Sequence, residues 1–318
     1  MNYLLENYKD EDSLEKKAIR EGFGKGIVEA AKANEDIVVL NADLPGSLKL
    51  GDFEKEFPER YFQIGVAEQN MAGIGTGFAT YGKIPFITSF AAFSPGLNFS
   101  QIRLAAMGHQ NLKIIGSHYG LNTGPDGASA QMNADVAMMK ALAGMTIISP
   151  ADYNQAIQAT KAVAEMEGPA YLRVTREKFP VIIDAKSEFK IGKAQKFMEG
   201  SDITVIATGS IVYESLQASE MSGASIDFLN IHTVKPLDEE AIIESAKKTG
   251  KVIVVEEHNI VGGLGESVAR VLAENHPTKM KLIGVQDTFG ESGSQKDLWK
   301  KYKLDREYIK SEIQNILK

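Results

Sequence analysis

The stretch YFQIGVAEQN, residues 61–70, contains the local patterns from which the rest of the chain can be interpreted. Residues 61–64 are strand-like, Gly65 permits a tight turn, and a helix is expected from about Gln69. The same succession of a short apolar run and an amphipathic stretch recurs on both sides. This alternation predicts an α/β fold with a mostly parallel sheet whose two faces are covered by helices.

Outward from this stretch, a helix is expected at Ser13–Ala31 and a strand at Ile37–Leu40. On the other side, the expected strands are Ile84–Ser89, Leu112–Gly116, Met145–Ile148 and Tyr171–Val174, and the expected helices are Ser100–Met107, Asn133–Leu142 and Tyr153–Ala164.

A second alternating set follows a polar, lysine-rich segment, residues 184–197, that lacks strong periodicity. We therefore predict two domains, 1–183 and 198–318, joined by a linker at 184–197, with a smaller α/β domain at the C-terminal side. Its expected strands are Ile203–Ala207, Ser225–Leu229, Val252–Val255 and Lys281–Gly284, and its expected helices are Glu239–Thr249 and Gly265–Glu274.

The composition of the 318 residues narrows the class of protein. The net charge of −7 argues against binding to nucleic acid or to a membrane surface as the main activity. The absence of cysteine excludes disulfides, thiolate metal sites and a cysteine nucleophile. Residues 1–6 do not resemble a signal peptide, and no apolar run approaches the roughly 18 residues needed to span a bilayer. We expect a cytoplasmic protein that binds neither nucleic acid nor membrane.

In sheets of this kind, functional groups lie beyond the carboxyl ends of the strands. Asp43, the segment 90–93, His118 and Asp126 occupy such places in the predicted order of strands. Their positions indicate a site without specifying its chemistry.

Several stretches in order resemble the C-terminal half of transketolases, which depend on thiamine diphosphate. Residues 61–70 are similar to the strand–turn–helix of the family's pyrimidine-binding domain, with Glu68 in its G-x-x-E element. Residues 41–47 resemble the first strand-end loop and residues 117–127 the substrate loop. The C-terminal domain of split transketolases is matched by residues 256–259, 262–265 and 289–293.

The resemblance implies a partner, because the family binds the cofactor's diphosphate and Mg²⁺ (or Ca²⁺) through a G-D-G motif in another domain. No Gly-Asp-Gly occurs in this sequence. We therefore expect an N-terminal transketolase subunit to carry the diphosphate site and to bind most of the metal, and we expect no metal site in this chain. The family also implies self-association, with two copies of each chain in an α2β2 assembly.

For the cofactor, the resemblance implies that Glu68 contacts the aminopyrimidine and favours the tautomer that generates the thiazolium ylid. Read from its position alone, Glu68 is a first-turn glutamate that complements a helix dipole. Phe93 is expected to stack on the pyrimidine, with Phe90 as the competing candidate. The place of a further family aromatic holds Gly96, and Asp43 is expected near the thiazolium.

The resemblance also implies a grip for a sugar phosphate. Its members are Arg20, Ser47, His118 and Arg176, and arginine forks suit phosphate oxygens. Asp126 matches the residue that reads a substrate hydroxyl, although an aspartate before a glycine is also an ordinary turn residue.

One position departs from the family pattern. Ala130 stands where transketolases usually carry a histidine that contacts the donor substrate. This departure has three interpretations: an altered substrate, compensation by a side chain of the partner, or impaired activity. The predicted activity is transfer of a two-carbon ketol unit from a ketose to an aldose phosphate, with a substrate altered from the usual ketose phosphates. Two alternatives stay open: another thiamine enzyme, similar to deoxyxylulose-phosphate synthase or to the β subunit of a 2-oxo-acid dehydrogenase, and a non-catalytic regulatory homologue.

Overall fold

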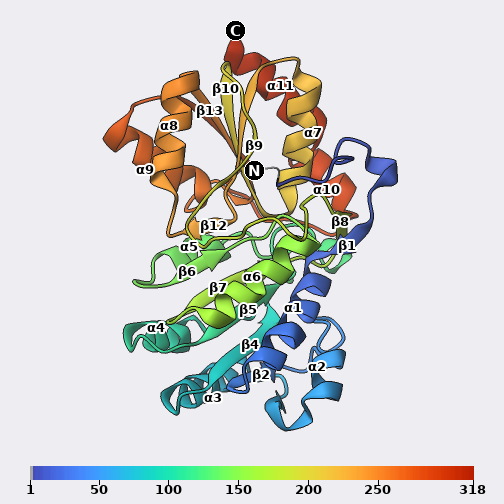
Figure 1. Cartoon of the computed structure of the whole chain (residues 1–318), viewed down its shortest axis with the longest axis vertical. Helices are drawn as coiled ribbons and strands as arrows, with labels where there is room; N and C mark the ends of the chain where they lie inside the picture. Colours follow the sequence, from blue (N-terminus) through green and yellow to red (C-terminus); the bar gives the residue numbers. More distant parts are fainter. Residues whose placement is uncertain (1–2) are drawn as a thin grey trace.

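A computed structural model describes residues 3–318 as two stacked α/β units, each with its own sheet (Figure 1). The first sheet has seven strands in the order β12-β6-β7-β5-β4-β2-β3. All neighbouring pairs are parallel except β12 with β6. Its strands are β2 (Ile37–Asn41), β3 (Tyr61–Gln63), β4 (Ile84–Phe90), β5 (Lys113–Ser117), β6 (Thr146–Ile148), β7 (Ala170–Val174) and β12 (Thr233–Lys235).

Alternation along the strands builds a core on each face of this sheet, because successive side chains point to opposite faces. Ile37 and Val39 pack with α1 (Ile19–Ala33), α2 (Gly51–Glu56) and α6 (Tyr153–Glu165). Val38 and Leu40 pack with the opposite cluster, which contains residues of α3 (Glu68–Thr80), α4 (Phe99–Met107) and α5 (Asp135–Lys140). The predicted mostly parallel sheet with helices on both faces is confirmed.

Helix α1 lies unusually close to α6. A side chain at Gly22 would place its Cβ 2.3 Å from the carbonyl oxygen of Tyr153, and one at Gly26 would meet Thr160 at 2.9 Å. Both positions therefore need the smallest residue for the helix pair to pack.

The expected helix start at Ser13 is wrong, because α1 begins at Ile19. The preceding residues form β1 (Lys16–Ala18), which pairs antiparallel with β8 (Lys178–Pro180). The Glu21 carboxylate accepts a hydrogen bond of 2.8 Å from the Ala18 N–H, which closes the first turn of the helix. Pairing with a strand 160 residues away has no local sequence signal.

The second sheet has five strands in the order β14-β13-β10-β11-β9. Strand β9 runs antiparallel to β11, and the other pairs are parallel. The strands are β9 (Gln195–Met198), β10 (Ile203–Thr208), β11 (Ile226–Asn230), β13 (Lys251–Asn259) and β14 (Lys279–Val285). The helices are α7 (Val212–Ser222), α8 (Glu239–Thr249), α9 (Leu264–Asn275), α10 (Gln295–Lys301) and α11 (Arg306–Leu317).

Besides the connecting segment of chain, apolar packing and strand pairing join the two units. One continuous apolar cluster contains Ile114 of the first sheet and Val254 of the second. Strand β12 comes after β11 in sequence but adds to the first sheet. The segment expected as a linker, 184–197, ends inside β9, so its last residues belong to the second sheet. Within residues 3–318, no helix combines the length and the apolar character needed to cross a bilayer.

Candidate active site at the carboxyl edge of the first sheet

Glu68 lies at the start of α3, beside the carboxyl end of β4. Its side chain is buried, and the Ser89 hydroxyl donates a hydrogen bond of 3.1 Å to its Oε1. Asn98 donates from its side-chain amide to the Glu68 carbonyl at 3.1 Å. Within residues 3–318, no other hydrogen bond to this carboxylate is formed, so Oε2 is available to a ligand.

Two phenylalanines and a histidine form a stack at the same edge of the sheet, where Phe90 directly follows Ser89. The ring of Phe90 lies 3.7 Å from that of His118, and 5.9 Å from that of Phe93, at interplanar angles of 23° and 14°. Phe90 is therefore occupied by protein contacts, and Phe93 forms the half-buried end of the stack. At Gly96 an added Cβ would lie 1.9 Å from the Ala92 carbonyl oxygen, so no aromatic side chain fits there.

Arg20 approaches the same edge from the first turn of α1. Its Nη1 donates to the carbonyl oxygen of Ser47 at 2.9 Å and lies 3.5 Å from Nε2 of His118. Its buried Nε has no hydrogen-bond partner within residues 3–318. Burial and the nearby charge of Arg176 both lower the pKa of Arg20. An anionic ligand here would relieve that repulsion and satisfy free donors.

Arg176 follows β7 and completes the basic side of the site. Its Nη1 donates to the Thr123 carbonyl oxygen at 2.9 Å and lies 3.4 Å from Oδ1 of Asp126. Asp126 is exposed, so its carboxylate can reach a ligand. The loop that carries Asp126 and the arginine that follows β7 are therefore held together.

His118 is held as a neutral imidazole. Burial, together with the charges of Arg20 and Arg176, lowers its pKa to about 3. Its Nδ1 is 2.7 Å from the Ser117 hydroxyl, which orients the ring. The residue has a left-handed backbone, with φ of 60°, which costs on the order of 1–3 kcal/mol outside glycine. Strain of this kind persists only where surrounding contacts impose it.

Asp43 also has a left-handed backbone, with φ of 58°, but its side chain is exposed. Its N–H donates to Oε1 of Gln63 at 2.7 Å, and the same oxygen accepts from the Gly65 N–H at 3.2 Å. Gln63 thus ties the loop after β2 to the turn before Glu68.

The sequence reasoning missed Gln63, Ser89 and Asn98, which position the residues that it named. Each is a polar residue at a strand or helix end, and that was the available signal. The nine predicted site residues lie on the loops and helix starts at the carboxyl edge of the sheet. The hydrogen bonds and stacks described above connect seven of them in two groups. One group contains Arg20, Ser47, His118, Phe90 and Phe93, and the other contains Asp126 and Arg176. Glu68 is bonded to Ser89, which precedes Phe90, and Asp43 lies farther along the edge.

A ligand with a flat ring and a hydrogen-bonding nitrogen suits Glu68 and Phe93, because the carboxylate can bond to the nitrogen and the phenyl ring can stack on the flat face. The site offers fewer ligands for a metal ion. Among residues 3–318, no group of three or more acidic or histidine side chains is arranged to hold a metal. The arrangement can hold an aminopyrimidine on one side and an anionic sugar on the other.

Comparison with known proteins agrees with this geometry. Residues 15–181 match the model of the transketolase pyrimidine-binding domain, and residues 192–309 match that of the transketolase C-terminal domain. A putative transketolase C-terminal section of Methanocaldococcus jannaschii is 43% identical over 309 residues, which are 95% of this chain and 97% of the relative. A 6-deoxy-6-sulfo-D-fructose transketolase subunit of a Clostridium species is 38% identical, over 95% of each chain.

A solved structure gives the same result. It is a split-gene transketolase described as an inactive β4 tetramer, with a TM-score of 0.89 and 40% identity. The match covers 94% of this chain and 98% of that one. The chain therefore belongs to the transketolase family, in which it corresponds to the C-terminal subunit of a split transketolase.

Proposed function

We propose that this chain is one subunit of an enzyme that transfers a two-carbon ketol unit from a ketose to an aldose phosphate. The observation that carries the proposal is the placement at one sheet edge of a buried carboxylate, Glu68, an aromatic stack and two arginines. A carboxyl and a ring wall suit a pyrimidine, and paired guanidinium groups suit a sugar phosphate.

Thiamine diphosphate, when bound, supplies the carbon nucleophile that carries the two-carbon unit. Glu68 would share a proton with the ring nitrogen of the aminopyrimidine through Oε2, since Ser89 already occupies Oε1. Phe93 would stack on the pyrimidine, because Phe90 is engaged with His118. Asp43 would lie farther along the edge, toward the thiazolium.

The sugar phosphate would bind between Arg20 and Arg176, with Ser47 beside Arg20. His118, being neutral, would exchange a hydrogen bond with a substrate oxygen without adding a charge. Asp126 would accept a hydrogen bond from a substrate hydroxyl, which fits its exposed carboxylate.

Ala130 supports a substrate that differs from the usual ketose phosphates, because the family's donor-binding histidine is missing. The Clostridium relative acts on 6-deoxy-6-sulfo-D-fructose, a ketose with a sulfo group. Phosphate and sulfonate both offer oxygens to an arginine fork. The screen of donors should therefore include sulfonated ketoses.

An N-terminal subunit would supply the diphosphate site and Mg²⁺ or Ca²⁺. The similar β4 tetramer is described as inactive, which supports the need for the second chain. We infer an α2β2 assembly.

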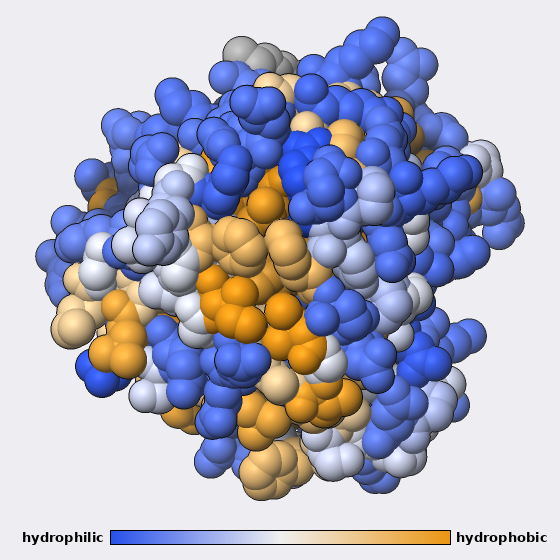
Figure 2. All heavy atoms as spheres, turned by 90° about the horizontal axis from the view of Figure 1, so that it is seen from below, coloured by the Kyte–Doolittle hydropathy of each residue, from blue (hydrophilic) through white to orange (hydrophobic). Residues whose placement is uncertain are grey.

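An apolar patch on and beside α3 and α4 offers a surface for another subunit (Figure 2). The patch consists of Val66, Ile74, Tyr81, Leu97, Leu104 and Met107. Gly73 and Gly77 on α3 face open space, which permits close approach of a partner's backbone.

Calorimetry tests the cofactor assignment first. The chain would be purified with a chain that carries the diphosphate domain, and thiamine diphosphate with Mg²⁺ would be titrated into the complex and into this chain alone. Tight Mg²⁺-dependent binding only in the complex is expected. Equally tight binding by this chain alone would mean that it contains a diphosphate site, and no binding to either would reject the cofactor.

Turnover tests the reaction itself. The complex with cofactor would be incubated with a panel of ketose donors and aldose phosphates, and ketol transfer is expected for at least one pair. Release of carbon dioxide from pyruvate would instead favour the 2-oxo-acid dehydrogenase or deoxyxylulose-phosphate-synthase type. Full activity that Glu68→Ala abolishes would exclude a non-catalytic homologue.

A further inference from the structure

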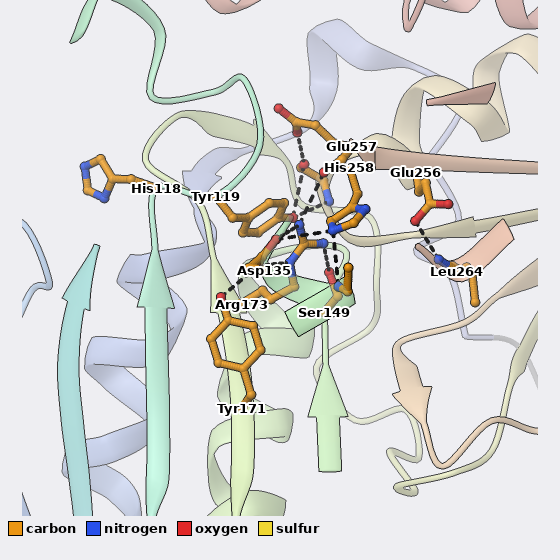
Figure 3. A network of polar contacts seen from close by, with 12 residues as sticks. His118, Tyr119, Asp135, Ser149, Tyr171, Arg173, Glu256, Glu257, His258 and Leu264 are labelled. Atoms are coloured by element: carbon orange, nitrogen blue, oxygen red, sulfur yellow. Dashed lines mark hydrogen bonds and ion pairs between the residues drawn. The ribbon is translucent and has the colours of Figure 1, made fainter. Parts of the chain in front are cut away.

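A buried carboxylate of the second domain reaches into the substrate loop of the first. Glu257, on β13, accepts a hydrogen bond of 2.8 Å from the Leu121 N–H at Oε1 and one of 2.6 Å from the Ser210 hydroxyl at Oε2. The side-chain amide of Asn122 lies 3.4 Å from both oxygens. Figure 3 shows Glu257 directed from its own strand toward the region of Tyr119 and Arg173.

Asn122 extends this contact to Arg176. Its Nδ2 donates to the Tyr119 carbonyl oxygen at 2.8 Å, and its Oδ1 accepts from the backbone N–H of Arg176 at 3.1 Å. One side chain in contact with Glu257 therefore bonds to both strand ends that carry the anion-binding residues.

The same loop holds His118 in its strained conformation. Thr123 donates from its hydroxyl to the His118 carbonyl oxygen at 2.7 Å, and Arg176 donates to the Thr123 carbonyl oxygen. Between them, Gly120 has φ of 68°, and a Cβ there would lie 2.7 Å from the Glu257 carboxyl carbon. The carboxylate thus packs directly against the loop backbone, with no room for the loop to shift toward it.

We propose that Glu257 is a positioning residue of the ketol-transfer site, through which the C-terminal domain sets the place of the substrate loop and of Arg176. This inference rests on the proposed function and adds a role in substrate binding for the C-terminal domain. Glu257 touches no substrate. It acts through Leu121 and Asn122 on His118 and Arg176.

Glu256, the residue before Glu257, provides a matched control for a substitution of Glu257. Glu256 lies on the same strand and is equally buried, at 2% exposure against 1% for Glu257. Its carboxylate accepts hydrogen bonds from the N–H groups of Leu264, at 2.7 Å, and Gly265, at 2.9 Å, which begin α9 (Figure 3). It supports its own domain, and no residue of the substrate loop, residues 117–127, donates a hydrogen bond to it.

The test compares Glu257→Gln with Glu256→Gln in the complete complex. Both variants keep the side-chain volume and replace one carboxyl oxygen by an amide nitrogen. Amide hydrogen exchange would measure the opening of the substrate loop without any turnover. Calorimetry with ribose 5-phosphate would measure the affinity of the site around Arg20 and Arg176 for a sugar phosphate. We expect Glu257→Gln to accelerate exchange at Leu121 and to weaken ribose 5-phosphate about 10-fold or more, the effect of weakening one hydrogen bond to a charged group. Thiamine diphosphate affinity should stay within about twofold, because Glu68 is not part of this chain of contacts.

Glu256→Gln should leave the exchange rate of Leu121 and the affinity for ribose 5-phosphate at wild-type values. Equal behaviour of the two variants, or faster exchange with unchanged affinity for ribose 5-phosphate, would overturn the positioning role. A wild-type complex that transfers no ketol unit would instead reject the proposed function, whatever the exchange data.

Discussion

The buried ion pair between Arg173 and Asp135 offers the sharpest test of what holds the two domains in register. Nε of Arg173 lies 2.6 Å from Oδ2 of Asp135, and its Nη2 donates to Oδ1 at 3.1 Å, with both side chains almost completely buried. Tyr171 donates to the same carboxylate at 2.7 Å, and Arg173 also donates to the Glu257 carbonyl oxygen at 3.3 Å. The pair therefore joins β7, α5 and β13.

The perturbation is Asp135→Asn, which keeps the volume and removes the charge. Burial alone would raise the pKa of Asp135, but the Arg173 guanidinium holds it below the usual range. Without the carboxylate, a buried guanidinium loses its counter-charge, and the Asn amide places a donor opposite other donors. Removing one partner of a buried pair costs roughly 3–5 kcal/mol of the free energy of unfolding.

Urea unfolding of the isolated chain, followed by circular dichroism, would measure this loss. The control is Lys161→Gln, which breaks an exposed pair with Glu29 at 3.4 Å and should cost less than about 1 kcal/mol. A triple apolar variant, Asp135→Leu with Arg173→Met and Tyr171→Phe, should be less destabilised than Asp135→Asn, because it leaves no buried guanidinium without its carboxylate. A loss below about 1 kcal/mol for Asp135→Asn would refute the reasoning.

Three further predictions concern the site. Glu68→Ala should lower kcat of the complex by at least about 10²-fold with an unchanged melting temperature, because the role is proton sharing; a smaller loss in steady-state assays would contradict it. His118 has a folded pKa of about 3 against an ordinary 6.5, so the unfolded state binds more protons between these values and stability decreases as the pH is lowered. Between pH 7 and pH 5 the loss should be about 2 kcal/mol, and His118→Gln should remove this part of the pH dependence in urea titrations; an unchanged dependence would show that the imidazole is not held neutral. Ala130→His should raise kcat/KM for ordinary ketose phosphates about 10²-fold by restoring a group for proton transfer, and unchanged rates across the donor panel would count against the altered-substrate proposal.

Local patterns sufficed for much of the fold. Most longer strands of the two sheets were predicted within two residues because each is a short apolar run, as at Ile37–Leu40 and Ile203–Ala207. The strand expected at Val252–Val255 is longer, because β13 continues to Asn259. The short strands β1, β8, β9 and β12 were not predicted, since they are only three or four residues long and exist only through their partners. The helices α2, α7, α10 and α11 were also missed, although α11 has a capping Asp305 that accepts from the Tyr308 N–H.

For the site, the sequence by itself determined which residue types stand at the strand ends, and several motifs in order, including the one around Glu68, indicated the family. Only the tertiary structure decided that Phe90 stacks on His118, that Arg20 lies 3.5 Å from the same imidazole, and that Glu257 supports the substrate loop from the other domain. Residue type and periodicity act over a few neighbouring residues, so the sequence records them directly. The pKa of His118 and the reach of Glu257 depend instead on burial and on groups more than 50 residues away. For His118 these groups come together when the first unit folds, and for Glu257 only when the two sheets pack.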